Sequence, residues 1–122
     1  MKGYGKELIL DLHDCNVNFF TRKAIKKFFR GLCKEIDMVP CKLVFWDYKW
    51  SRKPKNVAPH LDGCSAIQFI STSNITIHTF FQLKSVCLNI FSCKDFNPMK
   101  AGDFCKKYFE GKIVHQDVIN RL

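Results

Sequence analysis

The sequence predicts an α+β fold, a two-layer sandwich in which an antiparallel sheet carries two helices packed on one face. Segments with strand-like alternation outnumber the two segments with helical periodicity. Three consecutive strand-like segments are joined by turns too short to hold a crossover helix, which indicates antiparallel pairing. Two helices are too few to cover both faces of a sheet. At this length we expect one hydrophobic core and a single domain over residues 1–122.

The first half of the chain is expected to form a strand, a helix and a second strand. In residues 6–15, KELILDLHDC, the leucines alternate with other residues. Thr21 is a suitable N-cap for a helix that ends before Pro40. Residues 41–50, CKLVFWDYKW, predict a strand, and the charged, proline-containing residues 51–59 predict a loop. The apolar side of the helix consists of Ala24, Ile25, Phe28, Phe29, Leu32 and Ile36.

The second half is expected to form a three-stranded meander, a helix and a last strand. The meander consists of residues 64–71, 74–81 and 84–92, which read CSAIQFIS, NITIHTFF and KSVCLNIFS. Asn97-Pro98 places a proline at the first position of the second helix. Residues 111–119 predict the last strand. The buried side of the second helix consists of Ala101, Phe104, Cys105 and Tyr108.

The central strands carry apolar residues on both of their sides, so the sheet face without helices also needs cover. A second copy of the chain would supply that cover. We therefore expect a homodimer.

The formal net charge of +9 is concentrated in two stretches, TRKAIKKFFR and YKWSRKPK. Such charge is typical of a surface that binds nucleic acid or anionic ligands, or of a solvated helix face and loop. No base-reading motif accompanies it, so a nucleic-acid partner is not expected. No apolar run is long enough to span a bilayer, and MKGYGKELIL lacks the core of a signal peptide. We expect a cytoplasmic protein without membrane contact.

The seven cysteines indicate a reducing compartment. Their number is odd, they are scattered, and no two form a CxxC pair, so neither a disulfide framework nor a metal site is expected. Most of them, such as Cys33, Cys87 and Cys105, stand where a small buried hydrophobic residue would serve.

The stretch ISTSNITIHTFF places Ser73 in a predicted turn between two strands. A serine held in a tight turn can direct its hydroxyl at the preceding carbonyl, here that of Thr72, in an N-to-O acyl shift. His78 on the adjoining strand could then remove the Cα proton. Strand parity places His78 with Thr76 and Phe80, so turn geometry decides whether it reaches Ser73. The alternative is an ordinary serine-rich hairpin with a satisfied histidine.

Several short motifs between Pro59 and Ala101 follow one another at fixed spacing, namely GCSA, STSN, TIHT, FSC and NPMKA. In order and spacing they resemble the motifs of the small, prokaryotic-type S-adenosylmethionine decarboxylases, which are pyruvoyl-dependent. That family shows Gly-x-Ser-(Gly/Ala), Ser-Glu-Ser-His, TIHTWPE, Phe-(Thr/Met)-Cys-Gly and Asp-Pro-x-Lys-Ala. The opening YGKELILDLHDC also resembles its first strand. The matching residues are Gly63, Ser65, Ala66, Ser71, Ser73, Thr76, Ile77, His78, Thr79, Phe91, Cys93, Pro98, Lys100 and Ala101.

The resemblance implies that Ser73 cleaves its own bond to Thr72 and becomes a pyruvoyl group, leaving a β fragment 1–72 and an α fragment 73–122. His78 and Ser65 would assist this processing. The pyruvoyl ketone, as the cofactor, would form a Schiff base with the substrate amine and accept electrons as carbon dioxide leaves. Cys93 would return a proton to the α-carbon. The alternative is that Cys93 has no chemical role and is a small buried residue at the end of a strand.

The sequence departs from the family pattern at three places. Thr72 replaces the usual glutamate before the nucleophile, although the attacked group is a backbone carbonyl. Asn74 replaces histidine after it. HTWPE has become HTFFQ, with Phe80, Phe81 and Gln82. Gln82 replaces the acid that helps to hold the ribose hydroxyls, and it is an uncharged, weaker acceptor. The family's adenine-stacking aromatic is also absent, so the candidates for stacking are Phe80, Phe81 and Trp46.

These residues support four hypotheses of function. The first is an S-adenosylmethionine decarboxylase of polyamine (spermidine) biosynthesis. The second is the same chemistry on L-ornithine or L-arginine, whose distal cation would need a carboxylate such as Asp11, Asp14 or Asp62, although each of these could be an ordinary exposed carboxylate. The third is a non-processing homologue without catalysis, and the fourth is a small basic RNA-binding domain.

Overall fold

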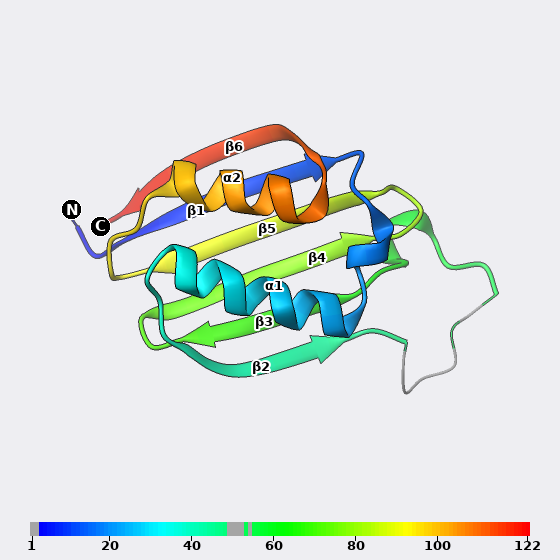
Figure 1. The fold of residues 1–122 in the computed structure, drawn as a ribbon, viewed down its shortest axis with the longest axis horizontal. Coiled ribbons are helices and arrows are strands. Elements are labelled where there is room, and N and C mark those ends of the chain that lie inside the picture. Colours follow the sequence, from blue (N-terminus) through cyan, green and yellow to red (C-terminus); the bar gives the residue numbers. More distant parts are fainter. Residues whose placement is uncertain (1–2, 49–52, 54) are drawn as a thin grey trace.

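The computed structural model describes residues 3–48, 53 and 55–122, and six of its strands form one sheet (Figure 1). The strand order is β2-β3-β4-β5-β1-β6, and every pair of neighbours is antiparallel. The strands are β1 (Gly5–His13), β2 (Pro40–Trp46), β3 (Ser65–Ile70), β4 (Ser73–Phe80), β5 (Ser85–Ser92) and β6 (Lys112–Arg121).

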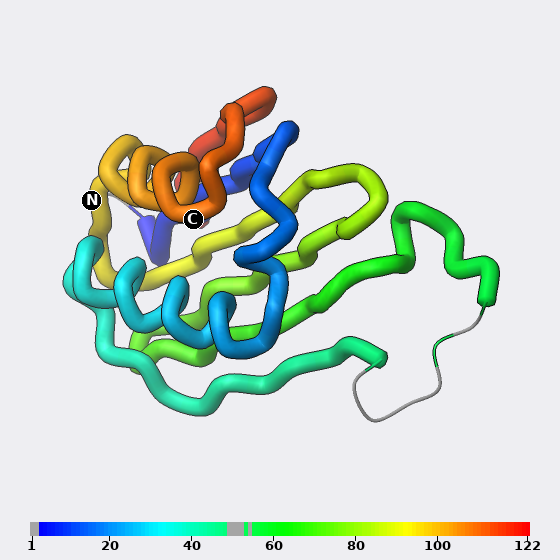
Figure 2. Tube along the Cα trace, turned by 45° about the vertical axis from the view of Figure 1, so that its right-hand side comes forward, coloured from blue at the N-terminus to red at the C-terminus, as the bar shows by residue number. Residues whose placement is uncertain are grey.

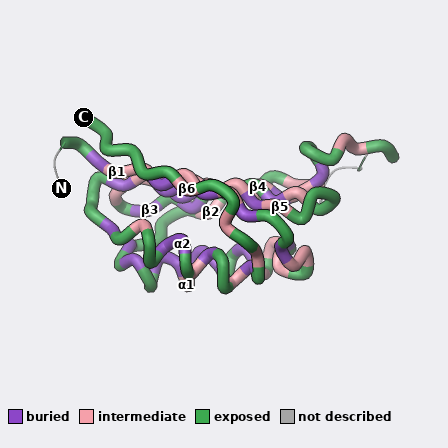
Figure 3. The backbone as a smooth tube through the Cα atoms, turned by 90° about the horizontal axis from the view of Figure 1, so that it is seen from above, coloured by how far each residue is buried: buried purple, intermediate pink, exposed green. Residues whose placement is uncertain are grey.

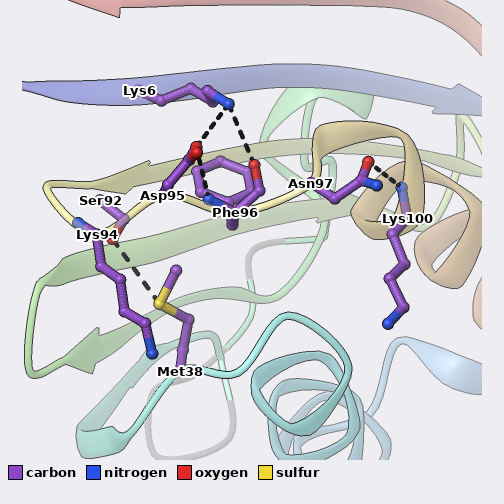
Figure 4. Close-up of polar contacts among 8 residues, drawn as sticks. All are labelled: Lys6, Met38, Ser92, Lys94, Asp95, Phe96, Asn97 and Lys100. Carbon is purple, nitrogen blue, oxygen red and sulfur yellow. Dashed lines mark hydrogen bonds and ion pairs between the residues drawn. The ribbon is translucent and has the colours of Figure 1, made fainter. Parts of the chain in front are cut away.

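Two helices, α1 (Arg22–Glu35) and α2 (Pro98–Phe109), lie on the same side of this sheet (Figure 3). The N-cap of α1 is Thr21, whose Oγ1 accepts a hydrogen bond from the Ala24 N–H at 3.1 Å. Asn97 caps α2 by accepting from the Lys100 N–H at 3.2 Å (Figure 4). The predicted two-layer fold and the order of its elements are therefore confirmed.

The hydrophobic core lies between the helices and the facing side of the sheet. Phe28 of α1 is at its centre, with ring contacts to Phe29, Phe104, Tyr108 and Phe109. Alternate residues of the strands close the core from the other side. They are Leu8, Leu10, Leu12, Ala66, Ile70, Ile75, Ile77, Val86, Leu88 and Ile90.

The opposite side of the sheet, here called the open face, carries large apolar side chains that remain partly exposed. Each follows the alternation of its strand, one position out of step with the buried residues. Val44, Ile67, Phe69 and Ile119 are each between 37 % and 43 % exposed. The open face is therefore an apolar surface with no covering layer among the described residues.

The bounds of β2 differ most from the sequence-based expectation. β2 begins at Pro40, which pairs with Ile70, and ends at Trp46, while residues 49–50 of the expected strand lie outside the described residues. Proline is tolerated there because β2 is an edge strand. Residues 55–62 project beyond the end of the sheet, and a short 3-10 turn at Pro59–Leu61 precedes β3 (Figure 2). Among the described residues, no helix has the length and apolar character needed to cross a membrane.

Candidate active site

Ser73 and His78 lie towards opposite ends of β4. Ser73 is the first residue of this strand, where it pairs with Ile70 and Ser92, which corrects the prediction that it lies in the turn; the turn consists of Ser71 and Thr72. His78 lies five positions further along, a separation of roughly 17 Å at about 3.4 Å per residue. The odd-numbered residues of β4 face the helices, whereas His78 is exposed on the open face. One chain alone therefore does not bring Ser73 and His78 together.

The hairpin turn before Ser73 is held by β5 and by the segment before β2. The Cys93 N–H donates to the Thr72 carbonyl oxygen at 3.1 Å, and the Ser71 N–H donates to the Val39 carbonyl at 3.0 Å. The Thr72 and Ser92 hydroxyls share a hydrogen bond of 2.8 Å. The carbonyl that Ser73 would attack thus already has an N–H donor, the kind of group that stabilises an oxyanion.

The backbone departs from ordinary strand geometry at Ser73, where φ is 156°. Relaxed two-residue hairpin turns place positive φ angles on the turn residues themselves. Ser71 and Thr72 have negative φ angles, so the departure falls on the next residue. Unusual backbone angles of this kind are found at functional sites.

Ser65 and His78 form a pair on the open face, with 2.8 Å between Ser65 Oγ and His78 Nδ1. This bond fixes the imidazole ring and leaves Nε2 available. Beside the pair lies a hollow of about 240 Å³, whose aromatic walls are Trp46, Tyr48 and Phe80. The structure therefore places two of the predicted stacking residues, Trp46 and Phe80, next to His78.

Phe81 and Gln82, the other predicted substrate contacts, do not line this hollow. The ring of Phe81 contacts that of Phe20, at 5.8 Å between centroids, on the helix side of the sheet. The Gln82 amide donates to Asp62 Oδ2 at 2.9 Å and to the Val57 carbonyl at 3.2 Å. Gln82 thus stabilises a loop within the chain.

The candidate carboxylates have different surroundings. Asp62 is only 6 % exposed and pairs with Lys53 at 2.7 Å, so it is not the ordinary exposed carboxylate considered from the sequence. Hydrogen bonds from Lys53 and Gln82 lower the pKa of Asp62 because they favour its ionised form. Asp14 is exposed in the turn after β1, with a φ of 56°.

Asp11 lies on the open face, in the same cross-strand row as Ser65, His78 and Cys87. It is 3.3 Å from Nδ1 of His115. Burial, followed by the hydrogen bond and the charge of Asp11, raises the pKa of the Cys87 thiol to about 11. Cys87, a member of this row, is half-buried and does not lie in the core, which corrects the sequence interpretation.

Cys93 is exposed immediately after β5, at the Ser73 end of the sheet. Its backbone N–H is the group that holds the Thr72 carbonyl, so Thr72, Ser73 and Cys93 lie together. Cys33 and Cys105 are buried as predicted. The described residues contain no cluster of histidine, cysteine and carboxylate side chains that could hold a metal ion.

Sequence reasoning missed Ser92 and Met38, which lie beside Thr72. The Ser92 hydroxyl is fully buried and also lies 3.8 Å from the Met38 sulfur. Ser92 directly precedes Cys93, but the contact with Thr72 depends on the register between β4 and β5, which the sequence does not state.

The fold is an α+β sandwich, an antiparallel sheet with two helices on one face, and a serine hairpin lies beside an exposed cysteine at one end of that sheet. Residues 6–122 match the family described as S-adenosylmethionine decarboxylase. The chain belongs to this family. This confirms the resemblance and the predicted enzyme class, a carboxy-lyase.

Individual relatives agree with the family match. The chain is 27% identical over 117 residues to the S-adenosylmethionine decarboxylase proenzyme of Thermosipho melanesiensis, covering 94% of this chain and 82% of that protein. It is 25% identical over 119 residues to the proenzyme of Fervidobacterium nodosum, covering 94% and 77% respectively. The crystal structure of the adenosylmethionine decarboxylase from Aquifex aeolicus has the same fold, with a TM-score of 0.77 and 19% identity over 99% of this chain and 92% of that one.

Proposed function

We propose that this protein is an S-adenosylmethionine decarboxylase of polyamine biosynthesis that generates its own pyruvoyl group from Ser73. The observation that supports this most directly is the Thr72 carbonyl, held by the Cys93 N–H beside the Ser73 hydroxyl. The residues at this turn are compatible with a pyruvoyl group, because that group is made from a serine at a cleavable peptide bond and needs no other precursor. Because the chain belongs to this family, we favour the decarboxylase over the RNA-binding and non-catalytic alternatives.

Self-cleavage would proceed in steps that use the residues at this turn. The Ser73 hydroxyl attacks the Thr72 carbonyl carbon, the peptide C–N bond breaks, and an ester forms. Removal of the Ser73 Cα proton then expels the Thr72 carboxylate and leaves a dehydroalanine at the start of the second fragment. Water replaces its nitrogen, ammonia leaves, and a pyruvoyl group remains. The Cys93 N–H stabilises the negative oxygen of the first step.

The base for proton removal would come from a second copy. His78 and Ser65 lie roughly 17 Å along the sheet from Ser73, estimated from the rise of a strand. Two copies packed with their open faces together, and their β4 strands antiparallel, would bring the partner's His78 to the end of β4 at which Ser73 lies. The half-exposed Val44, Ile67 and Phe69 would be buried in that contact.

In the mature enzyme the pyruvoyl group supplies an electron-accepting ketone. Cys93, at the same end of the sheet, would protonate the substrate α-carbon after carbon dioxide leaves. The hollow walled by Trp46 and Phe80 would take the adenine by stacking. Asp11 on the open face would face the cationic part of the substrate.

Mass spectrometry of the intact purified protein tests the proposal. We expect two fragments, 1–72 and 73–122, the second lighter by one ammonia than a serine-headed fragment. The Ser73→Ala variant should remain one chain and release no labelled carbon dioxide from S-adenosylmethionine. A wild-type protein found as one uncut chain of 14.3 kDa would overturn the proposal. Release of carbon dioxide only from L-ornithine or L-arginine would retain the mechanism and replace the substrate.

A further inference from the structure

We infer that Ser92 is a positioning residue for self-cleavage, which it assists by holding the side chain of Thr72. This inference rests on the proposed function, because it concerns how the bond before Ser73 is prepared. The family usually has a glutamate at the position of Thr72. The contacts that hold residue 72 in this chain must therefore be found among its own residues.

The buried Ser92 hydroxyl has polar contacts with Thr72, Lys94 and Met38. Its side chain is 0% exposed, and its Oγ is 2.8 Å from Thr72 Oγ1. The Lys94 N–H donates to the same Ser92 oxygen at 3.0 Å. The sulfur of Met38 lies 3.5 Å from the Thr72 hydroxyl and 3.8 Å from the Ser92 hydroxyl (Figure 4 shows the latter contact).

Each hydroxyl proton has one acceptor in this arrangement. If Thr72 donates to Ser92, then Ser92 donates to the Met38 sulfur, and if Ser92 donates to Thr72, then Thr72 donates to the sulfur. In both cases the Lys94 N–H occupies a lone pair of Ser92. The Ser92 hydroxyl is buried and Thr72 is partly buried, so breaking the bond between them would leave the buried Ser92 hydroxyl without one of its partners.

Thr72 is therefore held at two points by consecutive residues, the last residue of β5 and the residue that follows it. The Cys93 N–H fixes its carbonyl oxygen at 3.1 Å, and the Ser92 hydroxyl fixes its side chain at 2.8 Å. Threonine is β-branched, so fixing its hydroxyl restricts χ1 and, through it, the adjoining backbone. The backbone orientation at Thr72 sets the angle at which Ser73 approaches the carbonyl carbon. A misplacement of about 1 Å can cost on the order of a hundredfold in rate.

Pulse-labelled protein made by cell-free synthesis gives the rate of cleavage during a chase, measured on a denaturing gel. We expect Ser92→Ala to slow cleavage by roughly tenfold to a hundredfold, and Thr72→Val, which keeps the shape but loses the hydroxyl, to slow it similarly. Ser92→Thr restores a hydroxyl and should recover most of the rate. The matched control is Ser85→Ala, at the other end of β5, whose hydroxyl donates to the Leu83 carbonyl.

The double variant Thr72→Val/Ser92→Ala separates positioning from a general loss of stability. If Ser92 acts through Thr72, the double variant should cleave no more slowly than either single variant. Additive effects would overturn the inference. Melting curves recorded in a Ser73→Ala background report folding independently of cleavage. If Ser92→Ala does not fold, the cleavage rate of Thr72→Val alone tests the inference.

The possible failures are distinguishable. Equal cleavage rates for wild type and Ser92→Ala would overturn this inference and leave the proposed function intact. A wild-type chain that never cleaves would overturn the proposed function first.

Discussion

Cys93 is exposed, in contrast to the buried cysteines. Burial raises the pKa of the Cys33 thiol to about 11, and burial together with Asp47 raises that of Cys64 to about 12. Those thiols stay protonated and enclosed near neutral pH. Cys93 is exposed at the Ser73 end of the sheet, so it can exchange a proton with a substrate bound there.

Replacing Cys93 should separate maturation from turnover. Because the Cys93 contact with Thr72 is made by the backbone N–H, Cys93→Ala should still cleave into two fragments. It should lose decarboxylation on the order of a hundredfold or more, as expected for removal of a proton donor. Carbon dioxide release per cleaved chain measures this loss. Cys41→Ala removes another exposed thiol and should retain activity; an active Cys93→Ala enzyme would exclude the proton-donor role.

At the scale of elements, α1 and α2 are stabilised by the aromatic cluster around Phe28. Phe28 is 0% exposed and contacts four other rings. Phe28→Ala would leave a cavity that the strands and helices fill only in part, with an expected loss of about 3–5 kcal/mol in the free energy of unfolding. Urea titration of the uncleaved Ser73→Ala background measures it. Met99→Ala, at an exposed position of α2, is the control and should cost much less.

The loop before β3 is connected to the end of β4 through Asp62, which pairs with Lys53 and Gln82. The pKa of Asp62 is lower in the folded chain than in the unfolded one, so its ionised form stabilises the fold above the unfolded pKa. That contribution disappears as pH falls through the folded pKa. Asp62→Asn should therefore cost about 1 kcal/mol or less at pH 7, since Lys53 is half exposed, and progressively less below about pH 4.

Thermal unfolding at a series of pH values tests this dependence. The exposed Asp103→Asn in α2 serves as the control and should show a smaller effect at neutral pH. A cost for Asp62→Asn that stays constant down to the acid range would show that its ion pair does not contribute.

The elements could be predicted because their signals are local. The leucine alternation of β1, the Thr21 cap and the proline that opens α2 each depend on a few neighbouring residues. The position of β1 between β5 and β6 depends on long-range pairing and has no such signal. Ser92 and Asp62 were missed or misjudged for the same reason, since their partners are 20 residues away along the chain.

At the scale of the whole molecule, the proposed dimer would explain two features together: the uncovered open face and the distance between Ser73 and His78 along β4. Within one chain, none of the described elements covers the apolar side chains of the open face, and the Ser65–His78 pair lies far from Ser73. An antiparallel copy meets both needs in one contact. Phe69→Lys would place a charge in that contact, and it should give a monomer by light scattering that no longer cleaves.

Mixed dimers test whether each site is built from two chains. A Ser73→Ala chain and a His78→Ala chain, co-expressed with different tags, form dimers in which one site carries both substitutions and the other carries neither. If the partner's His78 serves Ser73, cleavage should appear in the mixture and only in the His78→Ala chain, although neither variant cleaves alone. If Ser73 and His78 instead acted within one chain, every chain in the mixture would lack one of them, and none would cleave. A gel developed for each tag distinguishes the two results, and a wild-type chain carrying each tag confirms that the tags permit processing.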